Sequence, residues 1–355
     1  MSVWKKLGAP LSLLLSIFSG CSAGNPRFPD ELQDSLERLR VLGDSWVEET
    51  DGEDGRALAA YRSFFGFQGE VLARGVDTPS GRVFLVWHRQ RSRPERAGAA
   101  LFAHGYMAHA GHFAELAARL SDHGWDLFLV DLPGHGLSYG RRYGIDSFEE
   151  YGSAVAATWQ AMPATLGADA DLPLALIGHS TGCSAIIEAL PRLQSIRKPD
   201  GVVLAAPLVD FPNLKFRSAV NGLANGKDIR IPAPFIQSAF IPKGVICNPA
   251  YREFSVTGDP LYERVYDPSW LEAYAIWREE LDSVESLDAG IPVLVLQGTG
   301  DSVVGWKSGR AVLERLFPRC EWREFKGFSH TILNVDPERM DAVMAALGPF
   351  LAGLR

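Results

Sequence analysis

Three features are scarce in this 355-residue sequence, and each scarcity excludes a class of protein. Basic residues number 35 against 43 acidic ones, a formal net charge of −8, so the basic face that nucleic-acid binding needs is not expected. No run of about 18 or more apolar residues occurs, which excludes a multi-pass membrane protein. The cysteines are few and far apart, without a C-x-x-C pair, which argues against a zinc ribbon or a dense disulfide framework: Cys21, Cys183, Cys247 and Cys320.

The first twenty residues have the pattern of an export signal. Two lysines at residues 5–6 form a positive n-region, and residues 11–18 (LSLLLSIF) form a short apolar h-region. The small pair at residues 19–20 then precedes Cys21, an arrangement that resembles the lipobox of bacterial lipoproteins, in which the peptidase cuts just before a lipid-modified cysteine. We therefore expect residues 1–20 to be a signal peptide and Cys21 to be lipidated. The mature protein is then anchored to a membrane facing the periplasm, and a soluble secreted or periplasmic protein is the alternative.

Most of the remaining chain alternates between short apolar strands and amphipathic helices. The pattern predicts strands at 99–103, 125–130, 174–177, 201–206, 291–296 and 320–325, and helices at 112–122, 148–166, 184–193, 307–317 and 337–351. Such alternation is typical of a parallel sheet with helices on both faces. Ahead of it, residues 69–74 and 82–88 flank a TPSG turn and predict a β-hairpin. Two leader helices are expected at 30–42, capped by Asp30, and at 56–65.

Residues 207–288 interrupt this alternation with a stretch rich in proline, asparagine and aromatic residues. Because so long an interruption of a compact sheet is not a plain loop, we expect an inserted cap that is closed by a helix near 270–282. Its apolar residues form either an acyl-chain pocket or the cap's own core: Phe211, Leu214, Phe216, Phe235, Ile236, Phe240 and Ile241. The expected organisation is a signal peptide (1–20), a tether with a helical leader (21–68), an α/β core (69–206 and 289–355) and a cap or lid (207–288).

The strongest chemical motif is the pentapeptide GHSTG at residues 178–182. It fits G-x-S-x-G, and it directly follows a predicted strand and precedes a predicted helix. A sharp strand-to-helix turn needs small flanking residues and lifts the serine hydroxyl above the sheet. Ser180 is therefore the candidate nucleophile, and a glycine-rich turn with an exposed serine is the alternative.

A serine hydroxyl needs a base to take its proton and an acid to orient that base. His330 is the only histidine after Ser180, so it is the candidate base. Asp301 stands just past the strand 291–296, at a carboxyl end of the sheet where catalytic groups collect, and is the candidate acid. Asp210, which follows another strand, is the second candidate.

The oxyanion that forms during acyl transfer needs two backbone N–H donors. One is expected from Thr181, directly after the nucleophile, and the other from Tyr106 in the loop that follows the strand 99–103. His104 in that loop is expected to be structural. In the nearby segment DLPGHGLS, Asp131 and His135 are likewise expected to brace the backbone.

Together, the segments HGYMAHAGHF, DLPGHGLS, GHSTG, GTGD and GFSH resemble the α/β-hydrolase superfamily. Over residues 82–351 the chain is most similar to the monoacylglycerol lipase and lysophospholipase group, although Met107 stands where that group often has glutamate. The resemblance implies an α/β-hydrolase fold with an inserted cap. It also implies one set of site residues: Ser180, Asp301 and His330 as the catalytic triad, with Tyr106 and Thr181 as oxyanion donors.

The expected function is that of a serine hydrolase acting on lipid-like or small carboxylic esters, of monoacylglycerol or lysophospholipid type, through an acyl-enzyme. No pattern asks for a metal or an organic cofactor. One alternative is an exopeptidase of the proline iminopeptidase type, for which Glu253, Asp259 and Glu263 could bind the substrate amine. The other is a non-catalytic lipoprotein on a hydrolase fold.

Overall fold

The computed structural model describes residues 28–90, 95–169, 171–212, 248–263 and 267–354. The predicted signal peptide, Cys21 and residues 213–247 of the predicted cap lie outside these ranges, and so do all of the cap's named apolar residues except the buried Phe211. The signal and the cap boundaries therefore stay predictions.

An eight-stranded sheet forms the centre of the molecule, in the order β1-β2-β4-β3-β5-β6-β7-β8. The strands are β1 (Glu70–Thr78), β2 (Gly81–Arg89), β3 (Gly98–Ala103), β4 (Trp125–Val130), β5 (Leu174–His179), β6 (Gly201–Ala205), β7 (Val293–Gly298) and β8 (Glu321–Phe325). β2 pairs antiparallel with both β1 and β4, and the other pairs are parallel. This mostly parallel sheet confirms the predicted α/β-hydrolase fold.

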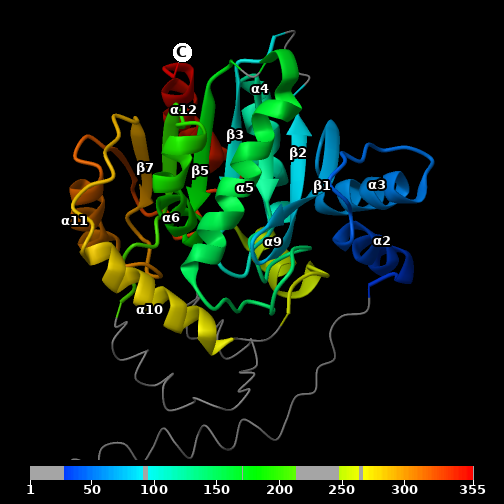
Figure 1. Cartoon of the computed structure of the whole chain (residues 1–355), viewed down its shortest axis with the longest axis horizontal. Helices are drawn as coiled ribbons and strands as arrows, with labels where there is room; N and C mark the ends of the chain where they lie inside the picture. The colour runs from blue at the N-terminus through cyan, green and yellow to red at the C-terminus, as the bar shows by residue number, and fades with distance from the viewer. Residues whose placement is uncertain (1–27, 91–94, 170, 213–247, 264–266, 355) are drawn as a thin grey trace, which may run out of the picture.

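Helices cover both faces of the sheet (Figure 1). They are α2 (Asp30–Arg40), α3 (Glu53–Phe65), α4 (Ala114–Asp122), α5 (Phe148–Leu166), α6 (Thr181–Ile196), α9 (Pro249–Glu253), α10 (Pro268–Asp282), α11 (Trp306–Leu316) and α12 (Pro337–Ala352), with short turns η3 (Ala110–Phe113), η4 (Gly167–Asp169) and the π-helical η5 (Phe254–Gly258). One core cluster joins the sheet to α5, α6, α10 and α11, and a second joins it to α2, α3, α4 and α12. Every residue of β3, β4 and β5 is buried because both faces are covered.

The leader helices belong to the second core cluster. Leu39 and Tyr61 are fully buried there, in the same cluster as Phe84 of β2. Asp30 is not the cap that we expected: Pro29 holds the N-cap position, and Asp30 lies in the first helical turn, where its charge still favours the helix dipole. The helix predicted from residue 112 also begins differently, because the turn η3 precedes α4.

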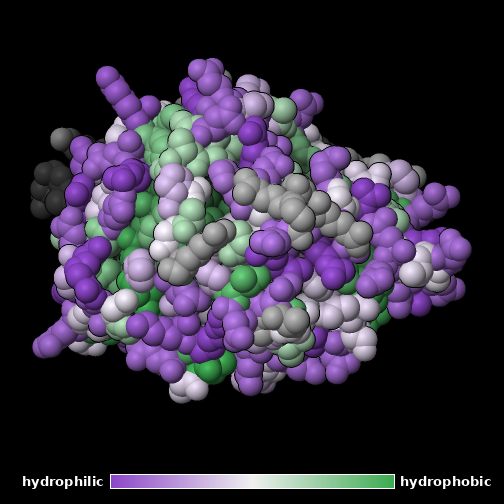
Figure 2. Space-filling model, turned by 90° about the horizontal axis from the view of Figure 1, so that it is seen from above, coloured by the Kyte–Doolittle hydropathy of each residue, from purple (hydrophilic) through white to green (hydrophobic). Residues whose placement is uncertain are grey.

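Among the described helices, none is both long and apolar enough to cross a membrane. Figure 2 views the molecule from above and shows a mostly hydrophilic surface with scattered apolar patches. In Figure 1, α9 and α10 lie below the sheet.

Candidate active site

Ser180 occupies a sharp turn between β5 and α6. Its backbone lies in the left-handed region, with φ 53° and ψ −117°, a conformation that a non-glycine residue keeps only where its surroundings hold it. A Cβ at Gly182 would lie 1.9 Å from the Ala103 carbonyl oxygen, and one at Gly178 would lie 2.8 Å from the Cys183 nitrogen. Both flanking positions must therefore be glycine for the turn to close and present the hydroxyl.

The structure brings together the three side chains predicted as nucleophile, base and acid. His330 Nε2 lies 2.9 Å from Ser180 Oγ, and His330 Nδ1 lies 2.8 Å from Asp301 Oδ2. Asp301 follows β7 and His330 follows β8, so parallel strands deliver both groups to the same edge of the sheet. All three residues are at most 8% exposed, so their hydrogen bonds are shielded from bulk water.

Several donors orient the Asp301 carboxylate. Its Oδ1 accepts hydrogen bonds from the backbone N–H groups of Val303 (2.8 Å) and Val304 (3.2 Å), and its Oδ2 accepts one from Gln297 Nε2 (3.1 Å) as well as that from His330. Burial by itself raises the pKa of Asp301, but its electrostatic interaction and hydrogen bond with His330, together with the Val303 and Val304 N–H groups, outweigh burial and lower it. The acid is therefore ionised and fixed in direction.

Asp210, the second candidate acid, has other partners. Its carboxylate accepts a hydrogen bond from the Ser308 hydroxyl, and its carbonyl oxygen accepts one from the Gly305 N–H at 2.9 Å. These contacts join the end of β6 to the start of α11. Asp301, and not Asp210, is the carboxylate that contacts His330.

His179, to which the sequence motif assigned no role, binds the backbone of the candidate base, His330. Its Nε2–H donates a hydrogen bond of 3.0 Å to the carbonyl oxygen of His330. Burial, with a smaller effect of His330, lowers the pKa of His179 to about 3, so this ring is neutral. The only signal in the sequence is its place inside GHSTG, immediately before the nucleophile.

The predicted oxyanion loop lies directly against Ser180. A Cβ added to Gly105 would lie 3.1 Å from the Cβ of Ser180, which explains why glycine stands there. The next residue, Tyr106, donates its hydroxyl to the carbonyl oxygen of Tyr143 (2.9 Å), and its ring lies against Trp270 of α10 with centroids 4.3 Å apart. Opposite this loop, Thr181 is the first residue of α6, so its N–H has no acceptor within the helix.

The expected structural braces are present. His104 donates from Nδ1 to the Gly105 carbonyl oxygen (2.8 Å) and accepts at Nε2 from the Leu132 N–H (2.9 Å). Asp131 accepts from the N–H groups of Ala110 (2.7 Å) and Leu137 (2.8 Å). Both side chains are fully buried and hold the loops that surround the elbow.

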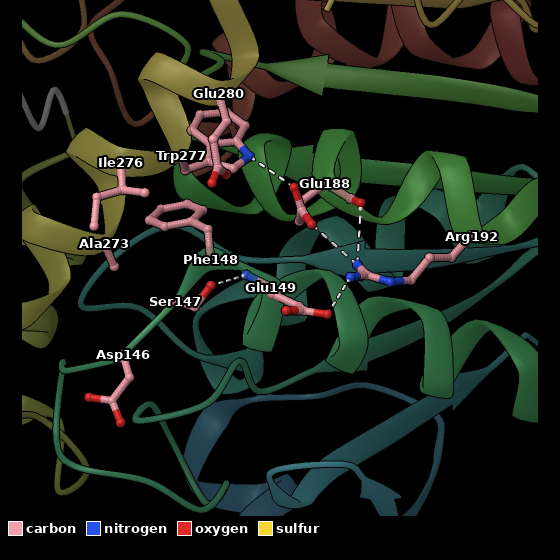
Figure 3. Close-up of a pocket in the computed structure, with 10 residues that line it drawn as sticks. All are labelled: Asp146, Ser147, Phe148, Glu149, Glu188, Arg192, Ala273, Ile276, Trp277 and Glu280. Atoms are coloured by element: carbon pink, nitrogen blue, oxygen red, sulfur yellow. Dashed lines mark hydrogen bonds and ion pairs between the residues drawn. The ribbon is translucent and has the colours of Figure 1, made fainter. Parts of the chain in front are cut away.

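Two further features carry polar groups. His109, His112 and Asp259 form a buried cluster whose ligand-type atoms lie within 4.8 Å of one another, the spacing that a metal ion would need. A separate pocket of about 230 Å³ lies between α5, α6 and α10 (Figure 3). In that pocket Glu188 accepts from Trp277 Nε1 (3.2 Å) and pairs with Arg192 (3.3 Å), so these two charged side chains are paired with each other.

Comparison with known proteins places this geometry in a family. A model of the family described as serine aminopeptidase, S33, matches residues 94–338, more than half of the chain. Phospholipase YtpA of Bacillus subtilis is 28% identical over 277 residues, which cover 74% of this chain and 97% of that protein.

Two solved structures share the fold. The crystal structure of Paleococcus ferrophilus monoacylglycerol lipase has a TM-score of 0.61 at 24% identity and covers 77% of this chain and 99% of its own. A soluble variant of monoglyceride lipase from Saccharomyces cerevisiae, in complex with a substrate analogue, has a TM-score of 0.67 at 17% identity, covering 79% and 94%. The chain is therefore a hydrolase of the α/β-hydrolase superfamily and belongs to the family described as serine aminopeptidase, S33.

Proposed function

We propose that this protein is a serine hydrolase that cleaves carboxylic esters of monoacylglycerol or lysophospholipid type through an acyl-enzyme on Ser180. The observation that carries the proposal is the continuous hydrogen-bonded line from Ser180 Oγ through His330 to Asp301, at 2.9 and 2.8 Å. The similarity of this chain to a phospholipase, and its likeness in fold to a monoacylglycerol lipase and a monoglyceride lipase, support a lipid-like ester as substrate.

The proposed chemistry follows from proton transfer along the hydrogen bonds between Ser180, His330 and Asp301. As Ser180 Oγ attacks the ester carbonyl carbon, His330 Nε2 takes the hydroxyl proton, and Asp301 stabilises the imidazolium through the Nδ1–H bond. The N–H groups of Tyr106 and Thr181 stabilise the oxyanion. His330 then gives its proton to the leaving alcohol, and a water molecule, activated by the same ring, releases the acid from Ser180.

In the exopeptidase alternative, two of the three acids considered for the substrate amine already have partners. The Asp259 side chain is fully buried and bonded to His109 and His112. Glu263 pairs with Arg142 at 3.0 Å, and Glu253 is exposed on α9. These contacts favour an ester substrate over a peptide with a free amino terminus.

Labelling tests the nucleophile. A fluorophosphonate probe should label the wild type and leave Ser180→Ala unlabelled. Ser184→Ala is the matched control, because Ser184 lies on the same helix but donates its hydroxyl to the Leu208 carbonyl oxygen. Equal labelling of Ser180→Ala and wild type would contradict the proposal.

A substrate panel tests the class. We expect kcat/KM to be highest on monoacylglycerol or lysophospholipid, lower on short p-nitrophenyl esters, and lowest on amino-acid p-nitroanilides. A preference for the anilides would instead identify an exopeptidase.

The localisation that we propose is a membrane facing the periplasm, reached through cleavage before Cys21 and lipidation of its thiol. Several acyl chains hold a protein stably at a membrane, whereas a single chain does so only marginally. Such an anchor would place the enzyme beside lipid substrates. Mass spectrometry of the mature N-terminus tests the modification, and an unmodified Cys21 would contradict the anchor. Cell fractionation tests the location, because Cys21→Ser should move the protein to the soluble fraction.

A further inference from the structure

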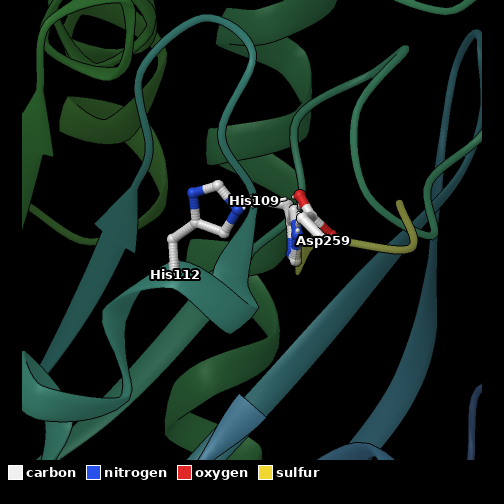
Figure 4. A group of neighbouring side chains, drawn as sticks. All are labelled: His109, His112 and Asp259. Carbon is white, nitrogen blue, oxygen red and sulfur yellow. Dashed lines mark hydrogen bonds and ion pairs between the residues drawn. The ribbon is translucent and has the colours of Figure 1, made fainter. Parts of the chain in front are cut away.

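The second histidine–aspartate cluster joins two segments that are far apart in the sequence. His109 and His112 lie in the loop and the turn η3 that follow β3, and Asp259 follows η5, within the predicted cap (residues 207–288) (Figure 4). Their side chains are 3%, 1% and 0% exposed. Both Nε2 atoms reach the same oxygen, Asp259 Oδ2, at 3.1 Å from His109 and 2.9 Å from His112.

The remaining partners decide where the protons of this cluster lie. His109 Nδ1 accepts a hydrogen bond from the Gly111 N–H (3.1 Å), so its proton is on Nε2 and is donated to Asp259. His112 Nδ1 lies 3.0 Å from the Tyr251 hydroxyl, which donates to it, so His112 also donates from Nε2. Burial alone raises the pKa of Asp259, but the two imidazole rings outweigh it and lower the pKa. A buried carboxylate thus receives two matched donors.

The same partners argue against a metal ion. A metal would need the Nε2 lone pair of His109, and then its Nδ1 would carry a proton facing the Gly111 N–H. In addition, the two ring centroids are 4.3 Å apart, whereas rings sharing one tetrahedral ion at about 2.0–2.1 Å would be about 5 Å apart. The cluster is a hydrogen-bonded group.

The loop held by this cluster is the one that carries the proposed oxyanion donor. Directly after Tyr106, Met107 lies in the left-handed region with φ 62°, which is strained for a side chain of this kind. Asp131 holds the loop from the core through the Ala110 N–H (2.7 Å). Asp259 holds it from the opposite side through His109 and His112, three and six residues after Tyr106.

We propose that Asp259 is a positioning residue of the reaction: through His109 and His112 it fixes the oxyanion loop and thereby the direction of the Tyr106 N–H. The inference rests on the proposed function, because it assigns Tyr106 to the oxyanion. It also makes a described segment of the predicted cap part of the catalytic geometry, although Asp259 itself touches no reacting atom.

Asp259→Asn tests the proposal. Asp259 Oδ1 accepts from the Leu261 N–H (2.9 Å) and Oδ2 accepts from both histidines, so an amide places its NH₂ group against a donor in either orientation. We expect kcat for ester hydrolysis to fall about tenfold while KM changes less than about twofold, since a displaced oxyanion donor loses part of its effect. Binding of a trifluoromethyl ketone, which forms a tetrahedral adduct with the serine, should weaken by about the same factor. Glu115→Gln on the exposed face of α4 is the matched control and should leave both values unchanged.

A milder variant keeps the test informative if Asp259→Asn does not fold. Tyr251→Phe removes the hydroxyl that donates to His112 Nδ1 and frees that ring to change its tautomer. We expect a loss in kcat of about threefold, again with KM preserved and with adduct affinity reduced in parallel.

Three outcomes would overturn the proposal. Variants with a lower unfolding midpoint but wild-type kcat and adduct affinity would show that the cluster is only structural. One equivalent of zinc in the purified wild type, with a chelator lowering its unfolding midpoint, would show a metal site. A parallel loss of kcat and adduct affinity in the control Glu115→Gln would show that the effect is not specific to the Asp259 cluster. Failure of the proposed function is distinguishable, because the wild type itself would then not react with fluorophosphonate at Ser180.

Discussion

The described part of the chain holds two buried groups of histidine and aspartate that differ in the partner of the second ring nitrogen. In the Ser180 group, His330 binds Asp301 through Nδ1 and faces a serine hydroxyl through Nε2. In the Asp259 group, the second nitrogen of each ring is occupied by a group that supplies a hydrogen, the Gly111 N–H for one and the Tyr251 hydroxyl for the other. The same residue types thus form a line that can move a proton in one place and a closed set of hydrogen bonds in the other.

The origin of the side chains differs as well. Ser180, Asp301 and His330 all follow strands of the central sheet, so the sheet fixes their spacing. His109 comes from a loop and Asp259 from the predicted cap, 150 residues apart, and the hydrogen bond between them creates the spacing. The comparison therefore predicts that changes in the first group alter the rate far more than the stability, and that changes in the second alter both.

The largest effect is expected for Asp301→Asn. An amide that keeps accepting from the Val303 and Val304 N–H groups must turn its NH₂ toward His330 Nδ1, which forces the ring proton onto Nε2. The ring then cannot accept the Ser180 proton, and kcat should fall about 10⁴-fold, which corresponds to about 5.5 kcal/mol. Ester hydrolysis, with unfolding followed in parallel, checks this. Near-wild-type kcat would show that another residue is the acid.

The next largest effect is that of Asp259→Asn on stability. At pH 7 we expect a loss of about 1–3 kcal/mol, because the change breaks a buried charged network. The folded state lowers the pKa of Asp259, so below its ordinary value of 3.8 the unfolded state binds more protons and wild-type stability falls with falling pH. Asp259→Asn lacks this contribution, although Asp301, whose pKa is also lowered, keeps its own. Because Asp259 also raises the pKa of His109, the comparison is made below the titration of that histidine. Urea unfolding between pH 5 and 3 should give a flatter curve for the variant, and parallel curves would contradict the assignment.

The fold could be predicted from the sequence, and the three candidate side chains could be chosen from it, because both follow local rules. The structure places these side chains in one hydrogen-bonded line, and their catalytic roles stay a prediction. Buried parallel strands read as apolar runs, and α5 forms at the predicted residues 148–166. Strand ends, together with a single histidine after Ser180, restricted the choice of site residues. Asp259, in contrast, was only a candidate for binding an amine, because nothing local relates it to His109 across 150 residues. Pairings between distant polar side chains depend on tertiary packing, which residue patterns do not encode.

A smaller effect is expected for His179→Phe, which removes the hydrogen bond to the His330 backbone and leaves the side chains of Ser180, His330 and Asp301 unchanged. Phenylalanine has a similar shape but cannot donate to the His330 carbonyl oxygen, which His179 contacts at 3.0 Å. We expect a loss of about 1 kcal/mol in stability and a severalfold decrease in kcat. Folding lowers the pKa of His179 to about 3, so near pH 6 the unfolded chain binds a proton there that the folded protein does not, and wild-type stability is lower at pH 6 than at pH 8. Because phenylalanine lacks this titration, the loss in stability should be smaller at pH 6 than at pH 8. An equal loss at both pH values would contradict the lowered pKa of His179.

The smallest effect is expected for Asp210→Asn, the matched control for Asp301→Asn. Both aspartates follow strands of the same sheet, β6 and β7, and both substitutions exchange a carboxylate for an amide of equal size. The asparagine oxygen can still accept from the Ser308 hydroxyl, and the backbone bond from Gly305 is unchanged. Since Asp210 makes no hydrogen bond to His330 among the described residues, kcat should change less than about twofold, against about 10⁴-fold for Asp301→Asn. Measured side by side with one ester substrate, the pair separates a carboxylate that orients the base from one that joins two elements of the fold, and a reversed order of the two effects would exchange their roles.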